Sequence, residues 1–169
     1  AIGLDQRIGN KFLSPGPGFG GSCFNKDILN LSYLCEYFGL KEVADYWDQV
    51  LKINDWQKSR ITYVISEKLF GNISRKKITI LGFAFKANTN DTRFSPAINI
   101  CKDLIEEGAI LSIHDPKVSK DQIRKVFQEQ NLLNQQNFDN KKALIEGENW
   151  NYFNDYEEAT TNSDAILIL

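Results

Sequence analysis

A cysteine at the end of a glycine-rich stretch is the first feature of this sequence that could do chemistry. Residues 16–27 read GPGFGGSCFNKD, and a helical pattern begins immediately after them. A glycine-rich turn lets backbone N–H groups approach a ligand and supplies the positive φ angles that such a turn needs. We expect Cys23 just before or in the first turn of the helix, where the helix dipole and Lys26 favour a thiolate. The pattern indicates a nucleophile, with Asp27 one turn further along as a base or as a group that orients a water or a lysine.

The same residues also have an ordinary structural explanation. Glycines cluster in loops, and most cysteines are small buried hydrophobic residues. Asp27 could serve only as a residue of the first helical turn. From the residues alone both explanations stay open for Cys23, whereas Cys35 and Cys101 fall on apolar faces of expected helices, where the core interpretation is the better one.

The composition limits the classes of protein that the chain can belong to. Its 169 residues are 42% hydrophobic, enough for a core, and the net charge of −2 gives no electrostatic case for binding nucleic acid or an anionic membrane. There is no apolar run of about 18 residues and no signal-peptide pattern. Three widely spaced cysteines fit free thiols in a reducing cytoplasm. The single histidine, His114, cannot build a histidine-based metal cluster, so we predict no metal.

The elements that must position Cys23 begin with two predicted helices. Apolar residues recur at helical spacing over residues 26–37, which end before Gly39, and over residues 41–70, which end before Gly71. About thirty helical residues would extend about 45 Å at 1.5 Å each. Such a helix needs support along its length, from the chain's own core, a neighbouring domain or a partner chain.

After residue 71 the pattern changes to alternating strands and helices. Short runs of β-branched residues predict buried strands. Between the first two strands, Ser95 and Pro96 indicate the start of a helix and Gly108 indicates its end. The expected elements are a strand at 77–83, a helix at 95–108, a strand at 109–114, a helix at 119–128, a loop or insertion at 129–140, a short helix at 156–161 and a strand at 165–169.

This alternation is typical of a parallel, doubly wound sheet, so we predict an α/β protein. We place the boundary between two domains near residues 71–76: a helical region at 1–72 and a Rossmann-like domain at 73–169. The first strand leads into Gly82 alone, where a Gly-x-Gly-x-x-Gly turn would need three glycines. The sheet is therefore predicted to bind a ligand other than a nicotinamide dinucleotide.

Both ends of the sequence suggest a piece of a longer protein. It opens on Ala1 without a methionine, and it closes on the apolar strand at 165–169 with no turn after it. A bare strand of this kind would leave an unprotected sheet edge.

Several longer motifs, in order, closely resemble the UDP-glucose 6-dehydrogenases, in their animal-like form, of the UDP-glucose/GDP-mannose dehydrogenase family. The resemblance covers essentially the whole chain and is weakest in the Asn/Gln-rich tract at 129–140. The motifs are DQRIGNKF at 5–12, FGGSCF-x-KD at 19–27, YW at 46–47, ND at 54–55, ILGFAFK at 80–86, DTR at 91–93, DPKV at 115–118 and YEEA at 156–159.

The resemblance implies a double oxidation of UDP-glucose to UDP-glucuronate with two NAD⁺ and no release of the aldehyde. In that family a cysteine adds to the C6 aldehyde as a thiohemiacetal, hydride transfer gives a thioester, and water hydrolyses it. Cys23 matches the nucleophile, and Asp27 matches the carboxylate that assists the water.

The resemblance also implies binding residues. Arg7 matches an arginine that reaches the substrate across a subunit interface. Residues of the glycine-rich loop match the segment that folds over the sugar and phosphates, and two residues of the second domain match further substrate contacts. The implied substrate contacts are Arg7, Ser14, Pro15, Gly16, Pro17, Gly18, Phe19, Gly20, Phe85 and Lys86. The implied NAD contacts are Cys23, Phe24, Asn25, Lys26 and Arg93.

The chain alone is expected not to oxidise UDP-glucose. No predicted strand in it leads into a Gly-x-Gly-x-x-Gly turn, and the family's NAD domain, catalytic lysine and asparagine precede the matching segment. The parent is expected to be a cytoplasmic homo-oligomer, at least a dimer, joined through the long helix around Trp47 and Trp56. Two alternatives stay open: a non-catalytic sugar-nucleotide-binding or dimerising module, and a sister dehydrogenase acting on GDP-mannose or a UDP-N-acetyl sugar.

Overall fold

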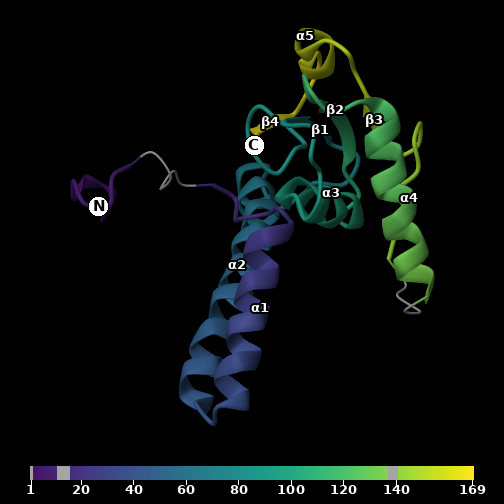
Figure 1. Ribbon diagram of the computed structural model, residues 1–169. Helices are drawn as coiled ribbons and strands as arrows, with labels where there is room; N and C mark the ends of the chain where they lie inside the picture. The colour runs from purple at the N-terminus through teal and green to yellow at the C-terminus, as the bar shows by residue number, and fades with distance from the viewer. Residues whose placement is uncertain (1, 11–15, 137–140) are drawn as a thin grey trace.

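The molecule consists mainly of two parts: a small α/β domain and a helical hairpin that projects from it (Figure 1). The computed structural model describes residues 2–10, 16–136 and 141–169. The chain forms a 3₁₀ turn at Ile2–Leu4, α1 (Ser22–Tyr37), α2 (Lys41–Lys68), β1 (Lys77–Leu81), α3 (Pro96–Glu106), β2 (Ile110–His114), α4 (Lys120–Gln136), β3 (Trp150–Tyr152), α5 (Tyr156–Thr160) and β4 (Ala165–Ile168).

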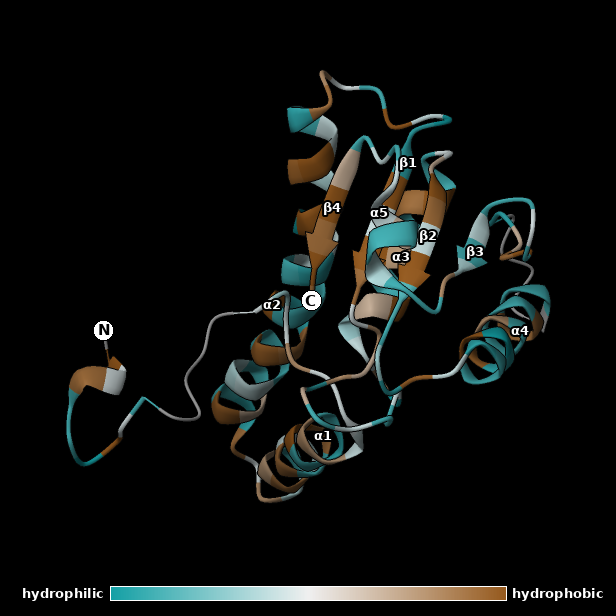
Figure 2. Cartoon of the chain, turned by 90° about the horizontal axis from the view of Figure 1, so that it is seen from above, coloured by the Kyte–Doolittle hydropathy of each residue, from teal (hydrophilic) through white to brown (hydrophobic). Residues whose placement is uncertain are grey.

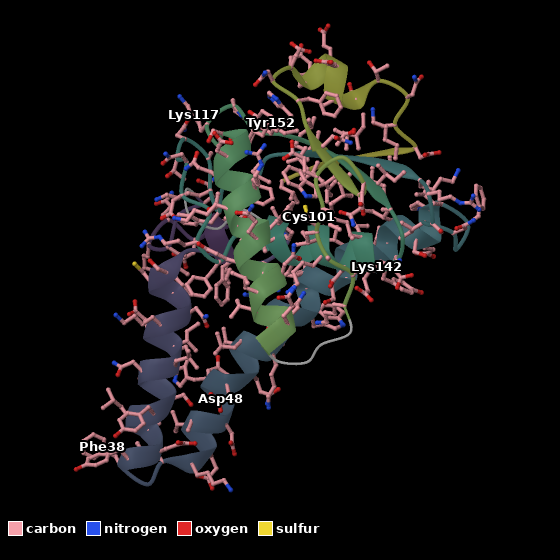
Figure 3. All side chains as sticks on the ribbon, turned by 90° about the vertical axis from the view of Figure 1, so that its right-hand side faces the viewer. Phe38, Asp48, Cys101, Lys117, Lys142 and Tyr152 are labelled. Atoms are coloured by element: carbon pink, nitrogen blue, oxygen red, sulfur yellow. The ribbon has the colours of Figure 1, made fainter. Side chains whose placement is uncertain are left out.

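The hairpin consists of α1 and α2, joined by a short turn at residues 38–40. Gly39 in this turn has a φ of +74°, and its N–H bonds to the carbonyl of Glu36, so α1 ends as the glycine predicts. Between the two helices the Ser32 hydroxyl donates to Asp48 at 2.6 Å. Figure 3 shows Phe38 at the far tip of the hairpin, and Lys117 and Tyr152 at the opposite end of the molecule.

Both predicted helices are confirmed, with one change at the first. α1 begins at Ser22, four residues before the expected start at 26, because Gly21 is the last residue outside the helix, with a φ of +83°. Cys23 therefore lies within the first turn of α1. α2 runs for 28 residues and ends before Gly71, whose φ is +77°. Over the described residues no helix is both long and apolar enough to cross a bilayer.

The four strands form one parallel sheet in the order β3-β2-β1-β4, which confirms the predicted α/β architecture. Ile78 of β1 is in register with Leu111 of β2 on one side and with Ala165 of β4 on the other. α3 and α5 lie on opposite faces of the sheet, and α4 lies beside β3 (Figure 1). Figure 2 shows that the central strands are strongly apolar, as burial on both faces requires.

The core surrounds the sheet and extends to the end of α2. The central residues of β1 and β2, Trp150 of β3 and the inward face of α3 are fully or almost fully buried. Apolar residues near the end of α2, Ile61, Ile65 and Leu69, pack against this cluster. The domain boundary expected after residue 72 falls in the turn between α2 and β1, and it stays a prediction.

Two elements differ from expectation. The Asn/Gln-rich tract predicted as a loop from residue 129 continues α4 as far as Gln136, while residues 137–140 lie outside the described residues. The reason is tertiary: the Asn131 amide pairs with both the N–H and the carbonyl of Leu144, at 2.9 and 3.0 Å, which holds α4 against the returning chain. β3 was not predicted, since three residues are too few for an alternating pattern.

Candidate active site

A cavity of about 330 Å³ opens at the carboxyl edge of the sheet. It lies at the ends of β1 and β4, which stay paired there: a Cβ placed on Gly82, after β1, would come within 2.8 Å of the carbonyl oxygen of Leu169, after β4. In the sheet, β1 lies between β2 and β4. The chain runs from β1 to β2 and β3 on one side and then returns to β4 on the other side, so the cavity between the ends of β1 and β4 occupies a topological switch point. Parallel sheets bind their ligands at such points.

One buried carboxylate organises the wall of this cavity. Asp115, 5% exposed, accepts the N–H groups of Phe83 and Ala84 on one oxygen and those of Lys117 and Val118 on the other, at 2.6–3.1 Å. Burial acts against ionisation of this carboxyl, but the four backbone donors outweigh it and lower its pKa. Asp115 thereby ties the loop after β1 to the loop after β2.

The remaining cavity surface is favourable for an anion. The N-terminus of α3 contributes Ser95, Pro96 and Ala97, and the Ser95 hydroxyl caps the helix by accepting the Ala97 N–H at 3.2 Å. Lys86 and Lys117 also line the cavity. A helix N-terminus and two lysines around one hollow form a binding site suited to phosphate groups.

The glycine-rich segment passes between α2 and the cavity. Pro17 and Gly18 line the cavity itself. The Asn54 side chain accepts the Phe19 N–H at 2.8 Å and donates to the Phe19 carbonyl at 3.1 Å, while Gln57 donates to the Gly16 carbonyl at 3.3 Å. The segment is therefore held by side chains of α2.

On its other side the segment contacts the loop after β1. A Cβ at Gly21 would come within 2.9 Å of the Phe85 ring, and the Gly21 N–H bonds to the Arg93 carbonyl at 3.0 Å. The next residues begin α1, so the exposed thiol of Cys23 lies close to Arg93. The pKa of Arg93 is raised chiefly by its bonds to Asp91, and Cys23 contributes a smaller electrostatic effect in the same direction. The thiol is thus within electrostatic reach of a guanidinium.

Most of the described residues expected at a substrate or cofactor site meet here. Gly16 to Gly20, Cys23, Phe85, Lys86 and Arg93 surround the junction of the hairpin and the sheet, and Asn25 lines a smaller cavity of about 140 Å³ beside Gly20 and Gly21. Phe24 packs on Phe19 with ring centroids 5.1 Å apart, while Lys26 and Asp27 are exposed on α1. The roles assigned to these residues stay predictions. Ser14 and Pro15 lie outside the described residues.

Among the described residues, Arg7 is a predicted site residue that does not line the cavity. It lies in the N-terminal segment, which stands apart from the sheet (Figure 1), and it pairs with Asp5 at 2.7 Å.

Two organising residues, Asn54 and Asp115, received no role from the sequence. Asn54 lies at helical spacing from Leu51 and Ile61, on the stripe of α2 that faces inward, so a polar residue among apolar ones was the available signal. Asp115 directly follows the end of a buried strand, where chemistry-bearing residues of parallel sheets gather.

Comparison with known proteins identifies the family. Residues 1–56 match the central domain, and residues 79–169 the UDP binding domain, of the UDP-glucose/GDP-mannose dehydrogenase family. The chain belongs to this family. Residues 57–78, which include the second half of α2 and the first two residues of β1, lie between the two matches. The match to the UDP binding domain covers the rest of the sheet.

Members of the family with known names are closely similar over part of their length. UDP-glucose 6-dehydrogenase 2 of Arabidopsis thaliana is 59% identical over 125 residues, which are 74% of this chain and 26% of that protein. UDP-glucose 6-dehydrogenase of Drosophila melanogaster is also 59% identical, over 73% of this chain and 26% of its own length. The chain thus spans about a quarter of the length of the curated relatives it matches.

Solved structures of the family share the fold. A UDP-glucose dehydrogenase from Pyrobaculum islandicum matches with a TM-score of 0.73 and 29% identity, over 99% of this chain and 33% of that one. A GDP-mannose dehydrogenase from Pseudomonas aeruginosa matches with a TM-score of 0.68 and 23% identity, over 97% of this chain and 34% of that one.

Proposed function

We propose that the protein containing this chain is an NAD-dependent UDP-glucose 6-dehydrogenase that oxidises UDP-glucose to UDP-glucuronate. The observation that carries the proposal is the position of Cys23: an exposed thiol in the first turn of α1, directly after the glycine segment that borders the cavity. The names and 59% identity of the two relatives favour glucose over other sugars.

The cavity is proposed to hold the UDP part of the substrate. Its phosphates would lie at the N-terminus of α3 between Lys86 and Lys117, where they replace water as partners of N–H groups and ammonium ions. Phe85 and residues 16–20 would border the sugar. The family's UDP binding domain, matched over residues 79–169, supports this assignment.

The sulfur of Cys23 is proposed to carry the sugar between two oxidations. The thiolate adds to C6 of the aldehyde, forming a C–S bond and a hydroxyl group. Loss of a hydride from that carbon and of the proton from its hydroxyl group leaves a thioester, and attack by water breaks the C–S bond to give a carboxylate, a proton and the free thiol. In total four electrons leave C6, one water is consumed and three protons are released. Asp27 would assist the attacking water.

NAD, when bound, accepts the hydride in each oxidation. In this chain Lys26 and Arg93 are exposed cationic side chains beside Cys23, which suits a pyrophosphate, and Phe24 and Asn25 would complete the contact. The remaining NAD contacts, and the family's catalytic lysine and asparagine, are proposed to come from residues outside this chain. We therefore expect the isolated chain to be inactive.

The active form is proposed to be a cytoplasmic homo-oligomer. Ile53, Trp56 and Tyr63 of α2 are each more than 60% exposed in the single chain. Burying such a row against a second copy would stabilise a dimer. A neighbouring subunit would then supply Arg7 to the substrate.

The proposal is tested on the complete protein that contains this chain. With UDP-glucose and NAD⁺, replacing Cys23 by serine should lower NADH production at least about 10³-fold, since the thioester can no longer form. Cys35→Ala, at a buried position away from the cavity, is the matched control and should retain turnover. Undiminished turnover by the Cys23→Ser enzyme would contradict the mechanism. Binding of UDP-glucose by a wild-type protein that makes no NADH would instead favour a non-catalytic binding module.

A further inference from the structure

We propose that Asn54 is a positioning residue of the active site: its side-chain amide fixes the backbone of Phe19 and so sets where the glycine segment and Cys23 stand relative to the cavity. The inference rests on the proposed function for its catalytic consequence. The structural part concerns this chain alone.

The contact satisfies both polar groups of one residue. Asn54 Oδ1 accepts the Phe19 N–H at 2.8 Å, and Asn54 Nδ2 donates to the Phe19 carbonyl at 3.1 Å. Rotating the amide by 180° would oppose donor to donor and acceptor to acceptor, so only one orientation fits. Asn54 is 7% exposed, and removing its side chain would leave the Phe19 backbone groups without these partners in a half-buried place.

The neighbouring sequence is matched to this contact. A Cβ on Gly18 would come within 2.8 Å of Asn54 Oδ1 and 3.2 Å of Lys58 Cγ, and Gly18 has a φ of +119°. Only glycine lets the segment approach α2 this closely. One helical turn along α2, Gln57 donates to the Gly16 carbonyl, so the two amides hold the segment at both ends of Pro17 to Gly18.

The opposite side of the segment contacts the loop between β1 and α3. Gly20 and Gly21 pack against Phe85, and the Gly21 N–H bonds to the Arg93 carbonyl. Residues 19–21 therefore connect α2 to the loop that lines the cavity, and α1 begins at the next residue. A shift at Phe19 moves the start of α1 and, with it, the sulfur of Cys23 relative to a sugar bound in the cavity. Misplacement by about 1 Å can reduce a rate about 100-fold.

The first experiment measures amide hydrogen exchange of Phe19 in this chain. Asn54→Leu removes both hydrogen bonds at similar volume, and the Phe19 amide should exchange at least about tenfold faster, while amides of β1 are unchanged. Asn99→Leu, the same substitution at an exposed helical position in α3, is the control and should leave Phe19 protected. An unchanged Phe19 exchange rate in the Asn54 variant would overturn the proposal.

The second experiment separates positioning from folding in the complete enzyme. The Asn54→Leu and Asn54→Asp enzymes should lose roughly 100-fold in kcat while the Kd for UDP changes by less than about threefold, because most residues that line the UDP cavity belong to the sheet domain. Equal losses in UDP affinity and kcat, with a lowered Tm, would mean a merely structural role and overturn the proposal. Unchanged kcat would do the same. A wild-type enzyme without turnover would contradict the proposed function and leave the exchange experiment to decide the role of Asn54.

Discussion

Gly20 and Phe94 lie so close together that no side chain fits between them. A Cβ on Gly20 would collide with the Phe94 carbonyl oxygen and come within 2.9 Å of Pro96 Cδ. A Cβ on Gly16, four residues earlier, would meet no atom of the described residues within 4 Å, its chain neighbours apart. Gly20 therefore permits close contact between the glycine segment and the loop before α3, whereas Gly16 makes no such contact.

Replacing Gly20 by alanine is expected to destabilise the chain. The added methyl group must displace backbone rather than a flexible side-chain end, at a cost of about 1–3 kcal/mol, which corresponds to a fall in Tm of several degrees. Gly16→Ala is the matched control and should leave the Tm within about 1 °C. Equal melting temperatures of the two variants, measured by circular dichroism, would contradict the contact.

Removing the Asp115 carboxylate is expected to lower the free energy of unfolding by about 3 kcal/mol or more. Asp115→Ala leaves four backbone N–H groups without their charged acceptor, in a buried place. Asp121→Ala removes an exposed carboxylate that pairs with Arg124 and should change the free energy by less than about 1 kcal/mol. Urea denaturation of both variants checks the difference, and similar midpoints would count against the assigned role of Asp115.

The carboxyl of Asp91 is expected to titrate at unusually low pH. Its bonds to Arg93 lower its pKa to about 2, and the charge of Lys86 adds a small contribution. Because the pKa in the folded chain lies below its unfolded value of about 3.9, the pair stabilises the fold above about pH 4, and this contribution is lost as the pH falls towards 2.

Carbon-detected NMR of the Asp91 side chain measures this titration directly. Arg93→Gln should move the midpoint up towards 4, and it should also flatten the loss of stability between pH 4 and 2. A wild-type midpoint near 4 would mean that the ion pair does not form in solution.

Alkylation should distinguish the three thiols of the native chain. Cys23 is exposed, whereas Cys35 is buried and Cys101 is completely buried, with a pKa raised by that burial. Iodoacetamide acts on exposed thiolates, so Cys23 should be modified and the other two spared until the chain is unfolded in denaturant. Peptide mass spectrometry locates the label. Modification of Cys101 at the rate of Cys23 would be incompatible with the fold.

Self-association is expected to depend on the exposed aromatic face of α2. Trp56, 62% exposed, becomes glutamate in the test variant, which places a charge where a second copy would pack. The dissociation constant of the dimer, measured by analytical ultracentrifugation, should rise at least tenfold. Tyr156→Glu, at an exposed aromatic of α5 on the sheet domain, is the control and should leave it unchanged. An identical dissociation constant for the Trp56 variant would place the interface elsewhere.

The sequence was sufficient for most local structure. Regular apolar spacing located α1, α2, α3 and the central strands, and Gly39 and Gly71 marked the helix ends because left-handed backbone there favours glycine. The sequence-based prediction was wrong where contacts with residues far along the chain determine the secondary structure. Asn131 bonds to Leu144 and extends α4 through a tract whose composition indicates a loop, and β3 is an edge strand stabilised by its pairing with β2.

The candidate site divides in the same way. The sequence by itself determined that a thiol follows a glycine segment at the start of a helix, because φ angles and helix starts depend on adjacent residues. Only the tertiary structure decided that Asn54 meets Phe19, 35 residues away, and that Asp115 meets Phe83, 32 residues away. Such pairs form when packed helices and strands bring their ends together, and no local preference of either residue encodes the partner.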